Sequence, residues 1–519
     1  MVGRPAGGFI PAVDDPFAGM TSGTLSAQRL EYSLAMTSGE LFIEDDGLTT
    51  SYGIFGAPRT GKTHLLMYLL RQLLDLKSKK PEKRFGGLIL DPKAALIADI
   101  RTVVAEAGRS DDLVVINIDD LEREGRSVNP IDARFDPYEL GRMLVLAAQS
   151  AGAAASEPFW FAAWSNLFGA AVYLHDWLDS KVLTLRTLVD SVLLVESADA
   201  SGASERPIQR LARQGRQQLD SLDDTRRQDA ERAINQIEQF YRQEPENIET
   251  VNTLITRAYS GFQQSRFSRY SPPVLKVGER TTFYDQIIDE GKIVLVSVSP
   301  TDPGMAKTLC TLIKCLFQVT VLGRRSRVLE GSLHNYERPL VLAIDEYSQV
   351  ASEVPGEPMG DGHFFSLARQ NGCMGLVVTQ SVNVLQASSL KENWRSVFSN
   401  FGAKIFMRLA DNETTEEATK LIGETDWYLT SRGSSHSGDG MGSSTNTDLR
   451  DRKFPSSVFT QLLERRQACI VGSLDGNDSQ PSTYFVRVPD QDDPETDDTT
   501  PATSLGALEY AEHPQRPDA

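Results

Sequence analysis

Residues 56–63 read GAPRTGKT and limit the possible folds of this chain more than any other segment, because they match the pattern G-x-x-x-x-G-K-T. They follow a short apolar run and precede a stretch of helical character. Backbone N–H groups at a helix N-terminus bind anionic phosphates, and glycine lets the backbone approach them closely. We therefore predict a P-loop here, and a plain glycine-rich turn is the competing interpretation. The predicted phosphate-binding residues are Gly56, Ala57, Pro58, Arg59, Thr60, Gly61, Lys62 and Thr63.

Within this loop, two side chains have distinct expected tasks. Lys62 would reach the β- and γ-phosphates of a nucleotide, and the Thr63 hydroxyl would bind Mg²⁺.

A second segment, RPLVLAIDEYSQV at residues 338–350, supports the first. Its aliphatic run predicts a buried parallel strand that ends in two carboxylates, Asp345 and Glu346, which is a Walker B arrangement. Asp345 would hold Mg²⁺ through water, and Glu346 would orient or deprotonate the water that attacks the γ-phosphate. An acidic pair after a strand is also common as a helix N-cap. Together with the P-loop, the pair favours nucleotide hydrolysis over binding alone.

The composition is that of a globular protein, with 519 residues of which 40% are hydrophobic. No apolar window is long and charge-free enough for a membrane span, and the nearest candidate, residues 159–178, contains Ser165, Asn166, His175 and Asp176. We interpret that segment as a buried amphipathic helix. The N-terminus shows no secretory signal, and the four cysteines lack metal-site spacing, so we expect free buried thiols and a cytoplasmic protein.

The net charge of −18 argues against a surface that coats nucleic acid over its whole extent. Much of this charge is local, because residues 490–519 contain nine acidic side chains and one arginine, Arg516. A pore lined by a few basic side chains remains compatible with the rest of the chain, since a translocase contacts only a narrow track of nucleic acid.

Alternation of strand and helix patterns predicts a parallel sheet with helices on both faces. We expect an irregular N-terminal arm at residues 1–40 and a nucleotide-binding domain formed by residues 41–134 and 271–488. Residues 135–270 show long segments of helical period and predict an inserted all-α domain. The Gly/Ser-rich residues 431–447 predict a flexible loop, and residues 489–519 an acidic disordered tail.

A third buried strand is expected at residues 374–381, which read MGLVVTQS. Gln380 at its end would lie beside the P-loop, where it could sense the γ-phosphate or position the attacking water. Arg369 lies on the preceding predicted helix. In a ring ATPase it could reach the nucleotide of the neighbouring subunit as an arginine finger, whereas the alternative is a surface arginine on a solvated face.

The order of several motifs resembles type IV secretion coupling proteins, the TraG/TraD-type branch of the FtsK/HerA ATPases. The motifs are GAPRTGKT, LILDPKAAL, SVNPID, EPFWFAAWSNL, VLVSVSP, LVLAIDEY, ARQNGCMGLVVTQS and SNFGAKIFMRLADNETTEEATKLIG. The resemblance spans about residues 50 to 475 and implies an α/β fold, a RecA-like P-loop NTPase with a mainly parallel sheet and an inserted all-α domain. That α domain is implicated in substrate recognition in the family.

The resemblance also implies roles for individual residues. It supports Lys62 and Thr63 on phosphate and Mg²⁺, and Asp345 with Glu346 as the Walker B pair. Gln380 would be the sensor and Arg369 the finger. This chain departs from the family in two ways. Ala94 and Ala95 follow DPK where the family usually has Gly-Glu, and the usual N-terminal membrane anchor is not seen.

We therefore expect an ATP- and Mg²⁺-dependent DNA translocase that delivers DNA or nucleoprotein to a type IV secretion or conjugation channel. Its expected partners are DNA, single-stranded and bound without regard to sequence, further copies of itself in a homohexamer, a relaxase or other secretion substrate, and a separate membrane-anchored protein. That protein would bring it to the inner face of the cell membrane. One alternative is a HerA-like DNA motor in repair, defence or viral packaging. A second is a non-hydrolysing adaptor that binds nucleotide and recruits substrates.

Overall fold

The protein is described here from a computed structural model. The structure describes residues 40–41, 43, 45–117, 129–131, 135–150, 152, 158–179, 183–198, 203–263, 283–298, 303–329, 337–353, 360–433, 443–474, 482–489 and 508–510. Residues 1–39 of the predicted N-terminal arm and most of the predicted acidic tail lie outside these residues.

The centre of the fold is a sheet of 11 strands, of which a run of seven neighbours is parallel. In spatial order the parallel strands are β10 (Ala403–Phe406), β2 (Tyr52–Phe55), β9 (Cys373–Thr379), β8 (Leu340–Ile344), β3 (Gly86–Asp91), β7 (Ile293–Ser297) and β4 (Leu113–Ile116). All of them except β4 are buried along their whole length, because helices cover both faces. The predicted α/β fold class is confirmed.

Four antiparallel strands extend the sheet beyond β10. They are β13 (Gln467–Gly472), β14 (Ser482–Arg487), β15 (Leu508–Tyr510) and β1 (Glu40–Leu41). A short π-helical turn, η8 (Val458–Leu462), precedes β13. The strand β15 lies within the segment that the sequence predicted to be an acidic disordered tail, and it pairs with both β14 and β1.

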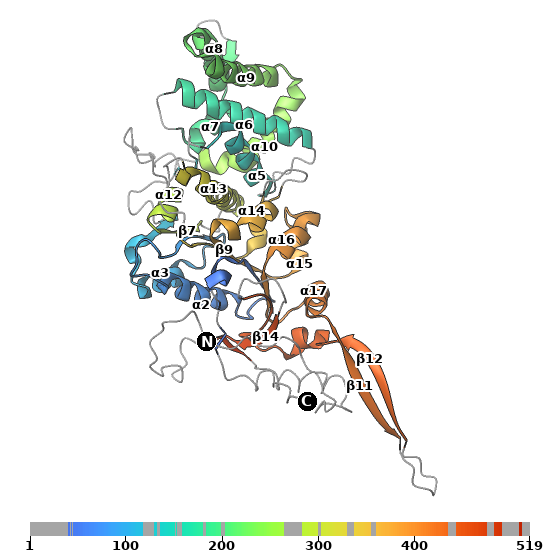
Figure 1. The fold of residues 1–519 in the computed structure, drawn as a ribbon. Helices are drawn as coiled ribbons and strands as arrows, with labels where there is room; N and C mark the ends of the chain where they lie inside the picture. Colours follow the sequence, from blue (N-terminus) through green and yellow to red (C-terminus); the bar gives the residue numbers. More distant parts are fainter. Residues whose placement is uncertain are drawn as a thin grey trace.

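Side chains alternate between the two faces of the parallel strands and feed two separate cores. On one face, α2 (Lys62–Asp75) and α3 (Ile97–Glu106) pack on residues such as Ile89 and Val341. On the other face, residues such as Leu90 and Leu342 join a larger core with the helices that Figure 1 shows on the opposite side of the sheet. These are α12 (Phe283–Asp289), α13 (Pro303–Leu329), α14 (Asp361–Leu367), α15 (Val382–Ala387) and α16 (Trp394–Asn400).

A helical region follows β4 in the chain and lies beyond α13 (Figure 1). It contains α5 (Pro137–Ser150), α6 (Pro158–Leu178), α7 (Leu185–Leu193), α8 (Pro207–Gln218), α9 (Asp224–Tyr241) and α10 (Pro245–Tyr259). It also contains a short hairpin of β5 (Glu196–Ala198) and β6 (Ala203–Glu205). Contacts of α5 with α6 and α13 join this region to the larger core.

Among the described residues, one helix is long and apolar enough by composition to cross a membrane. It is α13, over Pro303–Ser326, and 83% of that window is buried inside the protein. The helix at residues 159–178, which the sequence suggested as the nearest candidate, is α6, and it buries Trp164 and Phe168 in the same core. Both helices therefore act as core helices in this fold.

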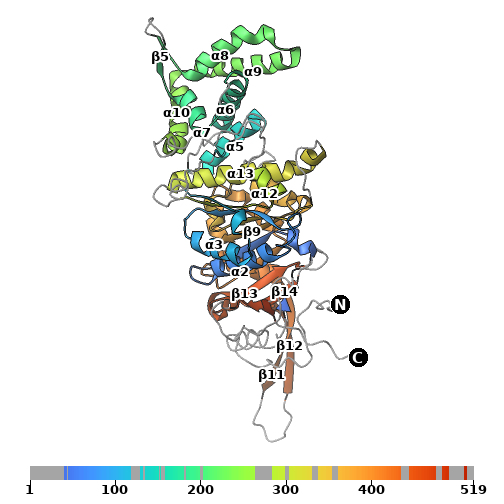
Figure 2. The same ribbon diagram turned by 90° about the vertical axis from the view of Figure 1, so that its left-hand side faces the viewer.

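A long β-hairpin projects from the end of the molecule opposite the helical region (Figure 1, Figure 2). It is formed by β11 (Glu424–Gly433) and β12 (Ser443–Arg452), and it follows α17 (Asn412–Ile422). The prediction of a flexible loop at residues 431–447 is wrong at both ends, because residues 431–433 and 443–447 are paired in strands. Residues 431–447 are rich in serine, threonine and glycine, so they lack the alternation of apolar and polar side chains that predicts a strand. Only the pairing between the two strands identifies this hairpin.

The four cysteines, Cys310, Cys315, Cys373 and Cys469, are buried free thiols, as predicted. Burial raises the pKa of each thiol, so they behave as inert core residues.

Candidate nucleotide site

The loop between β2 and α2 has the backbone geometry of a phosphate-binding loop. Gly61 has φ 108° and Arg59 has φ 66°, both in the left-handed region. A Cβ at Gly56 would lie 2.9 Å from Oγ1 of Thr60, so the loop leaves no room for a side chain there. The loop ends at the N-terminus of a helix of 14 residues, where unpaired N–H groups and the helix dipole favour an anion.

Lys62 lies inside this loop and not on the surface. Its Nζ donates to the carbonyl oxygen of Ala57 at 2.8 Å, and only 8% of the residue is exposed. Burial lowers the pKa of Lys62, while the nearby carboxylates of Glu346 and Asp345 act in the opposite direction. A phosphate bound in the loop would replace the Ala57 carbonyl as the partner of this ammonium group.

The other predicted P-loop residues surround this position. Thr60 is buried and donates from Oγ1 to the Ala57 carbonyl at 2.9 Å. Pro58 and Arg59 are exposed, and Thr63 is partly exposed in the first turn of α2.

Asp345 and Glu346 follow β8. They lie at the edge of the sheet formed by the carboxyl ends of the parallel strands, where β2 also ends. Burial raises the pKa of Asp345 to about 6, and the negative charges of Glu346 and Asp91 add to this effect. Glu346 has φ 52°, a left-handed conformation that is uncommon for a residue with a side chain. A cation bound beside Asp345 would favour the ionised form of its carboxyl group.

Gln380 follows β9, the strand between β2 and β8. Its Nε2 donates to the two carboxylate oxygens of Glu346 at 3.3 and 3.4 Å. The P-loop, the acidic pair and Gln380 therefore meet at one edge, since the carboxyl ends of neighbouring parallel strands lie together.

Arg369 does not join this group within one chain. The predicted helix ends at Leu367, and Arg369 lies exposed in a short 3-10 turn, η6 (Arg369–Asn371), just before β9. Since β9 has seven residues, Arg369 and Gln380 lie at opposite ends of a strand roughly 23 Å long. Any contact of Arg369 with a nucleotide would involve the site of another subunit.

Three residues at this edge were not predicted as site residues. Lys93 Nζ lies 2.6 Å from Oε1 of Glu346. The Arg466 N–H donates to the Thr60 carbonyl at 2.9 Å, and the Arg408 carbonyl accepts from the Ala57 N–H at 2.8 Å. The DPK motif was a signal for Lys93. No comparable signal marks Arg408 or Arg466, which reach the loop only because β10 and β13 extend the sheet beside β2.

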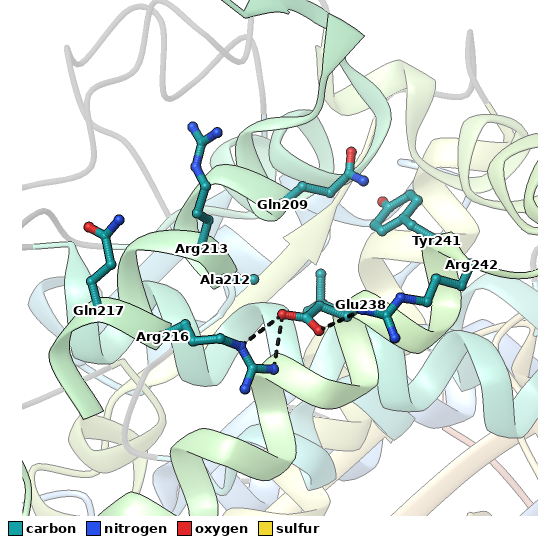
Figure 3. A pocket seen from close by; sticks show the side chains of 9 residues that line it. Gln209, Ala212, Arg213, Arg216, Gln217, Glu238, Tyr241 and Arg242 are labelled. Atoms are coloured by element: carbon teal, nitrogen blue, oxygen red, sulfur yellow. Dashed lines mark hydrogen bonds and ion pairs between the residues drawn. The ribbon is translucent and has the colours of Figure 1, made fainter. Parts of the chain in front are cut away.

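A separate cavity of about 520 Å³ lies in the helical region, between α8 and α9 (Figure 3). It is lined by Gln209, Ala212, Arg213, Arg216, Gln217, Ile237, Glu238, Tyr241 and Arg242. Glu238 accepts from both Arg216 and Arg242, and Arg213 pairs with Glu205, which lies outside the lining. This cavity shares no residue with the P-loop.

Across the part of the chain that the structure describes, no group of three or more His, Cys, Asp and Glu side chains could hold a metal ion by itself. This does not conflict with a Mg²⁺ site at the P-loop. Mg²⁺ typically binds one or two protein oxygens and completes its shell with water and substrate phosphates. The side chains of Thr63 and Asp345 carry oxygen atoms of this kind.

The sheet order, the P-loop and the acidic strand end define a RecA-like P-loop NTPase. Residues 339–457 match the family model described as the TraM recognition site of TraD and TraG. No curated protein sequence matches the chain.

Solved structures of one conjugative coupling protein, TrwB, resemble nearly the whole chain. The unbound TrwBdeltaN70 form has 14% identity and a TM-score of 0.55, with 91% of this chain and 92% of that chain covered. The complex with the GTP analogue GDPNP has 13% identity and a TM-score of 0.57, and the complex with ADP and Mg²⁺ has 13% identity and a TM-score of 0.53. Each covers 91% of this chain and 93% of that chain. The resemblance to coupling proteins is therefore confirmed, by sequence over residues 339–457 and by fold over most of the chain.

Proposed function

We propose that this chain is an ATP-driven coupling protein that delivers DNA or nucleoprotein to a type IV secretion or conjugation channel. One observation carries the proposal. Lys62, Asp345, Glu346 and Gln380 converge at one edge of a sheet whose fold matches conjugative coupling proteins over 91% of the chain.

In this proposal each site residue has a separate role in hydrolysis. Lys62 and the N–H groups of the loop hold the phosphates, and Thr63 with Asp345 would hold Mg²⁺. Mg²⁺, when bound, supplies positive charge that offsets the charge on the phosphate oxygens. Glu346 orients the attacking water and accepts its proton, and Gln380 fixes the Glu346 carboxylate through the contact at 3.3 Å.

Related structures support ATP and Mg²⁺ as the ligands. TrwB has been described in complex with ADP and Mg²⁺, with a non-hydrolysable ATP analogue and with a GTP analogue. The buried carboxyl group of Asp345, next to that of Glu346, fits a bound cation.

The proposed partners follow from the same resemblance. DNA would bind in the pore of a homohexamer through phosphate contacts, so binding would be largely independent of sequence. The match of residues 339–457 to a TraM recognition site favours docking of a secretion substrate or relaxase complex on this segment. A separate membrane-anchored protein would bring the cytoplasmic motor to the channel.

Two other functions remain in competition. A HerA-like DNA motor would use the same edge of the sheet, but the match at residues 339–457 favours a coupling protein. A non-hydrolysing adaptor needs the phosphate loop alone, and the contact of Gln380 with Glu346 favours hydrolysis instead.

Substitutions at two site residues test the hydrolysis. Lys62→Ala is expected to weaken ATP binding, because it removes the ammonium group from the loop. Glu346→Gln is expected to bind ATP but to hydrolyse it at least about 10²-fold more slowly, a typical loss for a general base. Lys79→Ala, at an exposed position after α2, is the matched control and should behave as the wild type. Near-normal turnover by Glu346→Gln would contradict the assignment.

The dependence of the ATPase rate on DNA tests the proposal that the protein is a DNA motor. The ATPase rate is expected to rise with single-stranded DNA of varied sequence and to fall steeply with added salt, because phosphate contacts release counterions. Stimulation by a purified relaxase but not by DNA would replace the DNA motor with a protein-substrate motor.

A further inference from the structure

The loop after β3 presents a lysine to the Walker B glutamate. This loop, residues 91–96, reads DPKAAL and is fixed by the fully buried carboxylate of Asp91. Oδ2 of Asp91 accepts from the Leu96 N–H at 2.7 Å and from the Ser297 hydroxyl at 3.1 Å, and Oδ1 accepts from the Lys93 N–H at 3.3 Å. The backbone of Lys93 is therefore held in place from both sides.

The side chain of Lys93 reaches across to the next strand. β3 and β8 are neighbours with Leu90 opposite Ile344, so Asp91 lies beside Asp345. From this position Lys93 Nζ lies 2.6 Å from Oε1 of Glu346. The Lys93 side chain is 44% exposed and that of Glu346 is 16% exposed.

This ion pair is poorly suited to a purely structural role. A pair with one partner half exposed to water contributes little to stability, because water already solvates its charges. The pair does occupy an oxygen of the carboxylate that hydrolysis needs.

We propose that Lys93 is a γ-phosphate-sensing residue that holds Glu346 in the nucleotide-free site and exchanges it for the γ-phosphate when ATP binds. The inference rests on the proposed function and deepens it. ADP carries no γ-phosphate, so Lys93 stays on Glu346 in the ADP state. In the ATP state the ammonium group moves to the phosphate oxygens, and the Glu346 carboxylate becomes available to water.

Binding measurements test the exchange without relying on turnover. Lys93→Met keeps the length of the side chain and removes its charge, and Lys93→Arg keeps the charge. The probes are fluorescent ADP and a fluorescent non-hydrolysable ATP analogue, each with Mg²⁺. Lys93→Met is expected to weaken binding of the ATP analogue about 10-fold more than binding of ADP. Lys93→Arg is expected to keep most of the difference in affinity that the wild type shows between the two probes. Lys79→Met is the matched control and should change neither affinity.

A double substitution separates sensing from a local structural effect. Glu346→Gln removes the competing partner, so it is expected to tighten binding of the ATP analogue while Lys93 is present. The gain should vanish when Lys93→Met is added. Equal changes in the affinities for ADP and the ATP analogue in Lys93→Met, or a gain from Glu346→Gln that persists in the double variant, would overturn the proposal.

Failure of the proposed function gives a different result. If the wild-type protein binds both nucleotides but never hydrolyses ATP, with or without DNA, the motor proposal fails. The affinity ratio of the two probes still decides whether Lys93 senses the γ-phosphate.

Discussion

Four residues other than glycine adopt a left-handed backbone at the nucleotide edge of the sheet: Arg59 (φ 66°), Ala94 (φ 53°), Glu346 (φ 52°) and Arg466 (φ 68°). Such conformations are unfavourable for residues with a Cβ and persist where the surrounding structure enforces them. Here they accompany the turns that end β2, β3 and β8 and begin β13. The concentration of strained residues at one edge supports a functional site at that edge.

Ala94 offers a direct test of this strain. It occupies the position of the DPK motif where coupling proteins usually have glycine, and its φ of 53° explains that preference. We expect Ala94→Gly to stabilise the protein by about 1 kcal/mol, because the relief of strain exceeds the added flexibility of the unfolded chain. Urea denaturation followed by circular dichroism measures the change. Ala95→Gly, at a neighbouring residue without positive φ, is the control and should be neutral or destabilising. A destabilised Ala94→Gly protein would contradict the expectation.

At the scale of elements, a buried ion pair joins α13 to α14 and to the loop after β8. Lys314 Nζ contacts both carboxylate oxygens of Asp361 at 2.6 Å, and neither side chain is exposed. Asp361 also accepts from Tyr347, which directly follows Glu346, and from Gln318 on α13. The Walker B loop is therefore fixed to the helices that cover this face of the sheet.

Removing one partner of this pair leaves a charge in a dry environment. Lys314→Met is expected to lower the free energy of unfolding by about 3 to 5 kcal/mol, because Asp361 would lose its counter-charge. The double variant Lys314→Met/Asp361→Asn should recover a large part of this loss. Thermal and urea denaturation of the single and double variants measure both changes.

Lys420→Met provides the control for this experiment. Lys420 forms an exposed pair with Glu417 and should change stability by less than about 1 kcal/mol. A similar small change in Lys314→Met would show that Asp361 does not carry an uncompensated charge.

At the scale of the whole molecule, the main parts of the structure lie one after another along one long axis. The helical region lies at one end, the β11–β12 hairpin at the other, and the sheet between them (Figure 2). Within the sheet, the P-loop and Arg369 occupy opposite edges. An arginine finger at Arg369 therefore requires a second subunit, which is consistent with the proposed ring.

Subunit mixing tests this arrangement. Arg369→Ala is expected to bind ATP normally and to lose most of its ATPase activity, since an arginine finger contributes roughly 10³- to 10⁵-fold to the rate. A mixture with Lys62→Ala subunits should regain activity at interfaces where an intact Arg369 faces an intact P-loop. The ATPase rate of the mixture is compared with that of each variant alone, under conditions where fluorescence transfer demonstrates subunit exchange. A mixture no more active than its components would contradict a role in trans.

The sequence by itself determined the parts of the site that depend on local patterns. The motif at residues 56–63 specified the loop because only glycine fits the backbone at Gly56 and Gly61, and the aliphatic run before Asp345 specified a buried strand. Gln380 could be placed because a polar side chain follows an apolar strand. These features follow from neighbouring residues and from strand period.

Only the tertiary structure decided which distant residues share the edge of the sheet. The order of strands brings Lys93 to Glu346 and Arg466 to Thr60, over separations in sequence that no local pattern encodes. It also places Arg369 at the far end of β9. The β11–β12 hairpin and β15 were missed for the same reason, since their polar strands form through backbone pairing with partners elsewhere in the chain and not through hydrophobic alternation.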